Sequence, residues 1–130
     1  MATILAVDDE PLICKLLEIS LSRLGHEVLT TTSGVAGLEL VQQARPSLVV
    51  LDLILPDADG LDMLQQIRVI APQTAVVIFT AWGSELSERK ASSLGASAFI
   101  EKGRVPGLLR STVSQILEAQ EGASSDKASV

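Results

Sequence analysis

Short apolar runs alternate with longer amphipathic segments along most of the chain. Five runs have the length of strands, and each is followed by a helical pattern: 3–7, 26–31, 48–51, 75–79 and 97–100. Residues 48–51 are apolar without interruption, which is typical of a strand buried on both faces. Repeated alternation of strand and helix is typical of a parallel sheet covered by helices. The pattern therefore predicts an α/β fold, a doubly wound five-stranded parallel sheet with five helices.

Cap and turn residues set the predicted limits of the first three helices. Asp9 is placed to cap the first helix, with Pro11 in its first turn, where a missing N–H costs nothing. Ser33 and Asp59 are placed to cap the second and third helices. The first helix carries apolar residues at helical spacing, namely Leu12, Ile13, Leu16, Leu17, Leu21 and Leu24.

The last two helices differ in the apolar surface they offer. The fourth, over 84–94, has only Leu86, Ala91 and Leu94 as apolar anchors, so we expect it to be weakly held and free to shift. The fifth, over 105–117, has the best amphipathic pattern of the chain. From residue 121 the composition indicates a disordered tail or a truncated linker. We expect one domain over 1–120 and a tail over 121–130.

Composition narrows the function classes. A formal net charge of −6 argues against direct nucleic-acid binding, which needs clustered Lys and Arg. No apolar segment reaches the length of a membrane span, and no basic segment precedes the first apolar run as in a signal peptide. Cys14 is the single cysteine, so it forms no internal disulfide and is expected to pack on the first helix. These features predict a cytoplasmic protein.

Chemically active residues stand at the ends of four predicted strands. Asp8 and Asp9 follow the first strand, Asp52 the third, Thr80 the fourth and Lys102 the fifth. In open parallel sheets ligands bind outside the carboxyl ends of the strands, so these residues are expected to converge on one crevice. Taken alone, Asp52 is equally well explained as a turn acid. The other residues favour a functional role.

Three carboxylates in one crevice repel each other, which either raises a pKa or recruits a cation. With oxygen ligands only, the cation should be hard, so we expect Mg²⁺, with Mn²⁺ as an alternative. The set is equipped for phosphoryl transfer: Asp52 attacks, the metal and Lys102 neutralise the phosphoryl oxygens, and Thr80 hydrogen-bonds one of them. The product is an aspartyl phosphate.

Four motifs in order resemble the receiver domain of two-component response regulators, over about residues 2–117. They are Val7-Asp8-Asp9-Glu10, Asp52 to Pro56 with Gly60, Thr80-Ala81, and Phe99 to Lys102. The resemblance implies a CheY-like, flavodoxin-like fold with strand order 2-1-3-4-5. It also implies that Asp52 accepts a phosphoryl group from the phosphohistidine of a sensor histidine kinase or phosphotransfer protein. Such a domain is not an enzyme and assists only its own phosphorylation and dephosphorylation.

The resemblance assigns further roles. It implies that Asp9, Asp52 and the backbone carbonyl of Ile54 bind Mg²⁺, with Asp8 helping through water. Thr80 would be drawn towards the phosphoryl group and Phe99 would swing inward, so that the face of the fourth helix, fifth strand and fifth helix changes. That face would control a downstream protein or a linked output domain.

Two features concern the rim of the site. Ile54 and Trp82 stand where the family sets the lifetime of the phosphoryl group, and both are bulky and apolar. We expect them to screen the acyl phosphate from water and to slow its hydrolysis. The family usually has proline after the lysine, whereas Gly103 follows Lys102 here. We expect that loop to have a trans peptide bond.

Two alternatives fail at named residues. An aspartate-nucleophile phosphatase needs a second acid two residues after the nucleophile, where Ile54 stands. A flavodoxin-type nucleotide-binding domain needs a Gly, Ser and Thr loop after the first strand, and the acids at 8–10 would repel phosphate. A homodimer is left open, because the exposed positions expected on the fifth helix are too mixed to decide: Arg110, Ser111 and Gln115.

Overall fold

The computed structural model describes residues 2–103 and 107–128, with side chains as far as residue 122. Within these residues, strands and helices alternate as β1 (Thr3–Val7), α1 (Pro11–Ser22), β2 (Glu27–Thr31), α2 (Gly34–Ala44), β3 (Leu48–Leu51), α3 (Gly60–Ile70), β4 (Ala75–Thr80), α4 (Glu85–Ser93), β5 (Ala98–Glu101) and α5 (Leu108–Ala128). The strands form one parallel sheet in the order β2-β1-β3-β4-β5. The predicted fold class and strand order are confirmed.

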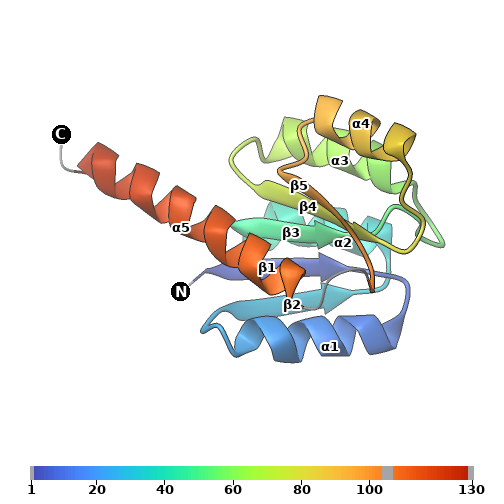
Figure 1. Cartoon of the computed structure of the whole chain (residues 1–130), viewed down its shortest axis with the longest axis horizontal. Helices are drawn as coiled ribbons and strands as arrows, with labels where there is room; N and C mark the ends of the chain where they lie inside the picture. The colour runs from blue at the N-terminus through green and yellow to red at the C-terminus, as the bar shows by residue number, and fades with distance from the viewer. Residues whose placement is uncertain (1, 104–106, 129–130) are drawn as a thin grey trace.

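Two apolar cores lie on the two faces of the sheet. Successive residues of a strand point to opposite faces, so Leu48 and Val50 enter one core and Val49 and Leu51 enter the other. Helices α1 and α5 cover the first face, and α2, α3 and α4 cover the second (Figure 1). Because β3 is buried on both faces, its carboxyl end is a rigid place for a functional residue.

The apolar stripe predicted on α1 is wider than the surface that the sheet covers. Leu17 and Leu21 are buried as expected, and Cys14 packs beside them in the helix. Leu12 and Leu16 are exposed, although both belong to the apolar pattern. Their exposure corrects the expectation that the whole stripe faces the core.

Helix α4 is held even more weakly than its sequence indicates. Ser84 caps it, and Ala91 is its one buried residue. Leu94 packs partly against the second core. The prediction that Leu86 anchors the helix is wrong, because its side chain is exposed. The apolar face of this helix is too narrow to bury both residues, so with Ala91 against the sheet Leu86 faces solvent.

Helix α5 is longer than expected and extends past the sheet on the side away from the arrowheads of the strands (Figure 1). Leu109, Val113 and Leu117 pack on the first core, and the side-chain amide of Gln120 donates to the carbonyl of Ser47 at 3.1 Å. The backbone is helical to Ala128. The tail or truncated linker expected over 121–130 stays a prediction. Val105, placed at the start of this helix by the sequence, lies outside the described residues.

Two of the three predicted helix caps are confirmed. The side chain of Ser33 accepts from Ala36 at the start of α2, and that of Asp59 accepts from Leu61 and Asp62 at the start of α3. Asp9 does not cap α1, whose N-cap residue is Glu10 and has no side-chain cap. With Pro11 in the first turn, this helix has one N–H fewer to satisfy.

Candidate functional site

Asp8 and Asp52 are fixed at the carboxyl edge of the sheet because backbone pairing continues one residue beyond their strands. The amide of Asp8 donates to the carbonyl of Thr31 at 3.1 Å, and that of Asp52 donates to the carbonyl of Val7 at 3.0 Å. Both side chains are buried, with 2% of Asp8 and 5% of Asp52 exposed. Two carboxylates from different strands therefore share one small volume.

Lys102 joins these two carboxylates. Its backbone amide donates to the carbonyl of Thr80 at 2.9 Å, which places the residue at the same edge directly after β5. Its Nζ lies 2.7 Å from Oδ2 of Asp8 and 3.2 Å from Oδ2 of Asp52. The same ammonium sits 5.8 Å from the centre of the Phe79 ring. The predicted convergence of these three strand ends is present in the structure.

One ammonium faces two buried acids, so negative charge is in excess. Burial raises the pKa of Asp8, and the hydrogen bond from Lys102 offsets only part of that rise. Burial alone would lower the pKa of Lys102, but its contacts with Asp8 and Asp52 outweigh that effect and raise it. A further positive charge is therefore favourable at this edge of the sheet.

Acidic oxygens gather beside the pair. Oxygens of Asp8, Asp9 and Glu10 lie within 4.8 Å of one another, and the amide of Glu10 donates to Oδ1 of Asp8 at 3.0 Å. Asp9 and Glu10 are exposed, so this group opens to solvent. A donor set made only of oxygen and carrying excess negative charge suits a hard divalent cation. The residues present thus fit Mg²⁺ or Mn²⁺.

The other predicted residues lie around this group. Thr80 ends β4 fully buried, and its Oγ1 accepts from the amide of Trp82 at 3.2 Å. Ile54 follows Asp52 by two residues, and its amide approaches Oδ1 of Asp52 at 3.5 Å. The side chains of Ile54 and Trp82 are 52% and 72% exposed. Phe99 packs partly buried against the second core.

The loop after Lys102 turns without the proline that the family usually has there. No cis peptide bond occurs among the described residues, so the Lys102–Gly103 bond is trans as expected. Gly103 has φ +77°, a conformation that residues other than glycine rarely adopt. Gly103 therefore adopts without strain a turn in which the backbone of another residue would be strained.

Three neighbours of the site were missed from the sequence. Glu10 enters the sequence prediction only as part of the first motif, although its position next to Asp9 is a signal for a shared site. The thiol of Cys14 donates to the carbonyl of Asp8 at 3.3 Å, and helical spacing alone could not show this contact. Phe79 looked like an ordinary strand residue, and only the fold brings its ring under Lys102.

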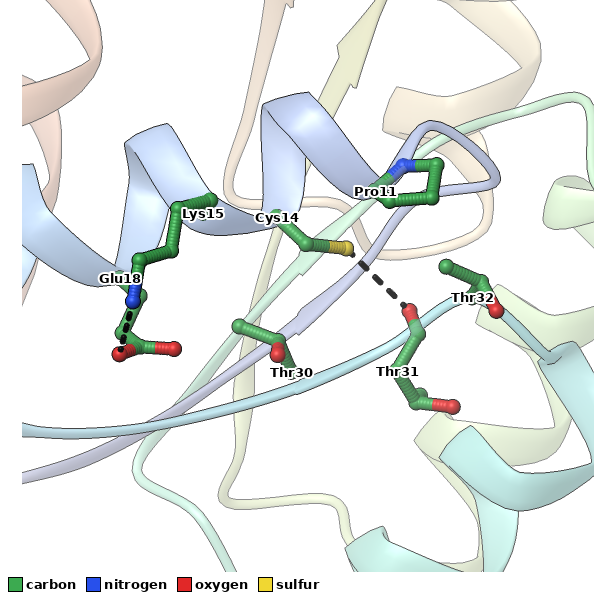
Figure 2. A pocket seen from close by; sticks show the side chains of 7 residues that line it. All are labelled: Pro11, Cys14, Lys15, Glu18, Thr30, Thr31 and Thr32. Atoms are coloured by element: carbon green, nitrogen blue, oxygen red, sulfur yellow. Dashed lines mark hydrogen bonds and ion pairs between the residues drawn. The ribbon is translucent and has the colours of Figure 1, made fainter.

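A separate pocket lies between α1 and the end of β2 (Figure 2). Its lining residues are Pro11, Cys14, Lys15, Glu18, Thr30, Thr31 and Thr32. The thiol of Cys14 points at the carbonyl of Thr31 across it, at 3.7 Å. None of the predicted site residues lines this pocket, so it is distinct from the acidic group.

Comparison with known proteins agrees with this arrangement. A family model described as response regulator receiver domain matches residues 4–125. The chain is 33% identical to the transcriptional regulatory protein AfsQ1 of Streptomyces coelicolor, over 99% of this chain and 57% of that protein. It is also 33% identical to the alkaline phosphatase synthesis transcriptional regulatory protein PhoP of Bacillus subtilis, over 91% of this chain and 49% of that one. The chain thus spans about half the length of these relatives.

A solved structure shows the same architecture. The CheY-like response regulator receiver domain from Methanospirillum hungatei superposes with a TM-score of 0.89 at 26% identity, over 95% of this chain and 98% of that one. Within the described residues, no helix is both long enough and apolar enough to cross a bilayer.

Proposed function

Because this chain belongs to the family of response regulator receiver domains, we propose that Asp52 is its phosphoacceptor. The phosphoryl group would come from the phosphohistidine of a sensor histidine kinase or a phosphotransfer protein. The observation that carries the proposal is the ammonium of Lys102 held between Asp8 and Asp52, at 2.7 and 3.2 Å. That ammonium can meet a phosphoryl oxygen on Asp52 with a small movement.

The transfer step is a displacement at phosphorus. A carboxylate oxygen of Asp52 attacks, the bond between phosphorus and the donor nitrogen breaks, and the electron pair returns to the imidazole. Lys102 neutralises negative charge on the phosphoryl oxygens. The hydroxyl of Thr80, which accepts from Trp82, can still donate to one of those oxygens. The domain would assist only its own phosphorylation and dephosphorylation.

We propose that Asp9, Asp52 and the backbone carbonyl of Ile54 hold Mg²⁺, with Asp8 acting through water. Mn²⁺ would serve in its place. When bound, the metal supplies a Lewis acid that offsets charge on the phosphoryl oxygens. The excess of buried carboxylate over Lys102 supports this assignment.

The proposed output is a shift in population of the face formed by α4, β5 and α5. A phosphoryl group would draw Thr80 towards it, and Phe99 would then turn inward. Gly83 leaves room beside Phe99, since a Cβ at that position would lie 3.0 Å from the ring. The weak anchoring of α4, with Ala91 as its buried residue, lowers the cost of such a shift.

The receiver would control a linked output domain or a separate downstream protein. Relatives about twice as long, both transcriptional regulators by name, support a linked domain that acts in transcription. A net charge of −6 supports leaving DNA contact to that other domain. We place this signalling in the cytoplasm, and a homodimer is compatible with it.

Intact mass spectrometry tests the phosphoacceptor. The parent, Asp52→Asn and Asp59→Asn are each incubated with acetyl phosphate, with and without Mg²⁺. We expect one phosphoryl adduct in the parent and in Asp59→Asn, only with Mg²⁺, and none in Asp52→Asn. Asp59 is the matched control because it is an exposed acid of the same loop. An adduct on Asp52→Asn of the same yield would overturn the proposal.

A further inference from the structure

The side chain of Asp57 accepts three hydrogen bonds from a distant part of the chain, close to the candidate site. It lies in the loop between β3 and α3, and its carboxylate accepts from the start of α2, more than twenty residues earlier. The hydroxyl of Ser33 donates to Oδ2 at 2.7 Å, the amide of Gly34 to Oδ1 at 2.8 Å, and the amide of Val35 to Oδ2 at 3.2 Å. The loop is thereby bonded to a helix on the same face of the sheet.

Two residues cap the start of α2, and they accept hydrogen bonds from different backbone amides. Ser33 satisfies the amide of Ala36 at 3.1 Å, and Asp57 satisfies the two amides before it. A carboxylate is also favoured at a helix N-terminus by the helix dipole. These hydrogen bonds, the one from Ser33 foremost, lower the pKa of Asp57, so the carboxylate is charged at neutral pH.

The same loop is closed at its base, next to Asp52. The amide of Gly60 donates to the carbonyl of Leu53 at 2.8 Å, and Ile54 pairs with Asp59 in an antiparallel bridge. The base also packs tightly, because a Cβ on Gly60 would overlap the carbonyl oxygen of Asp52. The loop is therefore held at its base by its own backbone and at its tip by α2.

The start of α2 fits closely against the loop tip. A Cβ on Gly34 would lie 2.6 Å from Cβ of Ala58 and 2.9 Å from Sδ of Met63. Only Leu55 and Pro56 separate Ile54 from Asp57, and the ring of Pro56 restricts the backbone between them. A shift of Asp57 away from α2 would therefore also move the backbone of Ile54.

We propose that Asp57 is a positioning residue, which bonds the loop between β3 and α3 to the start of α2 and thereby holds the Ile54 carbonyl in place for the metal. This inference rests on the proposed function, because that carbonyl is a proposed ligand of Mg²⁺. Asp57 itself does not touch the metal or the phosphoryl group. Its contribution is the fixed path of the loop.

Calorimetric titration with MgCl₂ tests this role on the parent, Asp57→Ala and Asp57→Asn. Groups that hydrogen-bond a metal ligand typically contribute about 10–100-fold to metal affinity. Asp57 acts on the Ile54 carbonyl only through the path of the loop, so we expect the Kd of Asp57→Ala to rise at the low end of that range, about 10-fold. Asp57→Asn keeps an oxygen for the amide of Gly34 and should recover part of the loss. Asp59→Asn removes the same charge from the same loop and should keep the parent Kd.

Stability measured on the same variants separates positioning from capping. Losing a cap destabilises the fold by itself, so a Kd within twofold of the parent in a destabilised Asp57→Ala would overturn the inference. A parent that binds no Mg²⁺ would overturn the proposed function and this inference together. Should Asp57→Ala fail to fold, Ser33→Ala removes one of the three donors and should raise the Kd in the same direction. An unchanged Kd in both Ser33→Ala and Asp57→Asn would then overturn it.

Discussion

The ammonium of Lys102 lies closer to Asp8 than to Asp52, at 2.7 Å against 3.2 Å. Lys102 thus compensates two acids from two different strands, and the acid that follows β1 holds it more tightly. A phosphoryl group on Asp52 would have to compete with Asp8 for this ammonium. A stronger contact between Lys102 and Asp8 would therefore make it more costly for Lys102 to move to a phosphoryl group on Asp52.

Replacing Lys102 should destabilise the metal-free protein. Lys102→Met leaves Asp8 and Asp52 buried without a positive partner, which typically costs about 3–5 kcal/mol in a fully buried pair. Because Lys102 keeps some contact with water, we expect a loss of about 2 kcal/mol in the free energy of unfolding by urea. Mg²⁺ should restore part of it by supplying positive charge.

Lys15→Met is the control for that experiment. Lys15 pairs with Glu18 at 3.5 Å on an exposed face of α1, and such pairs contribute about 0–1 kcal/mol. We expect little change in this variant, with or without Mg²⁺. Equal stability of Lys102→Met and the parent without metal would show that the ion pair does not hold the acids together.

Gly60→Ala should disturb the base of the loop between β3 and α3. The added Cβ would overlap the carbonyl oxygen of Asp52 and lie 2.5 Å from Cα of Leu53. Overpacking of this kind typically costs about 1–3 kcal/mol, which thermal or urea unfolding would detect. Gly122→Ala in α5 is the control, because a Cβ there meets nothing within 4 Å. If Gly60→Ala is as stable as the parent, the base of the loop can move to make room for the Cβ without loss of folding free energy.

Ile54→Asn should shorten the lifetime of the acyl phosphate. The side chain of Ile54 is half exposed at the rim of the site, so an amide in its place can order water near Asp52. We expect several-fold faster loss of the phosphoryl adduct, followed by intact mass over time. Val69→Asn, an exposed apolar residue of α3, should decay as the parent does. Equal decay in Ile54→Asn would remove the screening role.

The stabilising effect of Asp57 should depend on pH. Its pKa is lowered in the folded protein from an ordinary value of 3.8, so its contribution is complete above that value and is lost as pH falls through the folded pKa. We expect the parent to be more stable than Asp57→Asn from neutral pH to about pH 5, with the difference shrinking towards about pH 3. Urea unfolding over this range measures it, and a gap that widens in acid would contradict the assignment.

The fold could be predicted from local patterns because the sheet is buried on both faces. Residues 48–51 could hardly be anything other than an inner strand, and the β3 found is Leu48–Leu51. Ser33 and Asp59 could be predicted to start their helices, because a capping side chain bonds to amides in its own turn. The convergence of Asp8, Asp52 and Lys102 followed from strand direction alone.

Contacts between distant segments were not readable in this way. The role of Asp57 at α2 depends on how closely the loop passes the helix, which no spacing encodes. Leu12 and Leu86 fit apolar patterns yet are exposed, because the sheet covers less helix surface than those patterns offer. The extension of α5 to Ala128 could not be predicted, because its last residues are poor in apolar side chains and show no amphipathic pattern.

Trapping the phosphorylated residue tests the central claim most directly. Borohydride reduces an acyl phosphate to an alcohol, so the protein is treated after incubation with a phosphodonor and Mg²⁺ and then mapped by peptide mass spectrometry. The account predicts homoserine at position 52, with Asp8, Asp9, Asp57 and Asp59 unchanged. Homoserine at any of those four positions, with Asp52 intact, would contradict it.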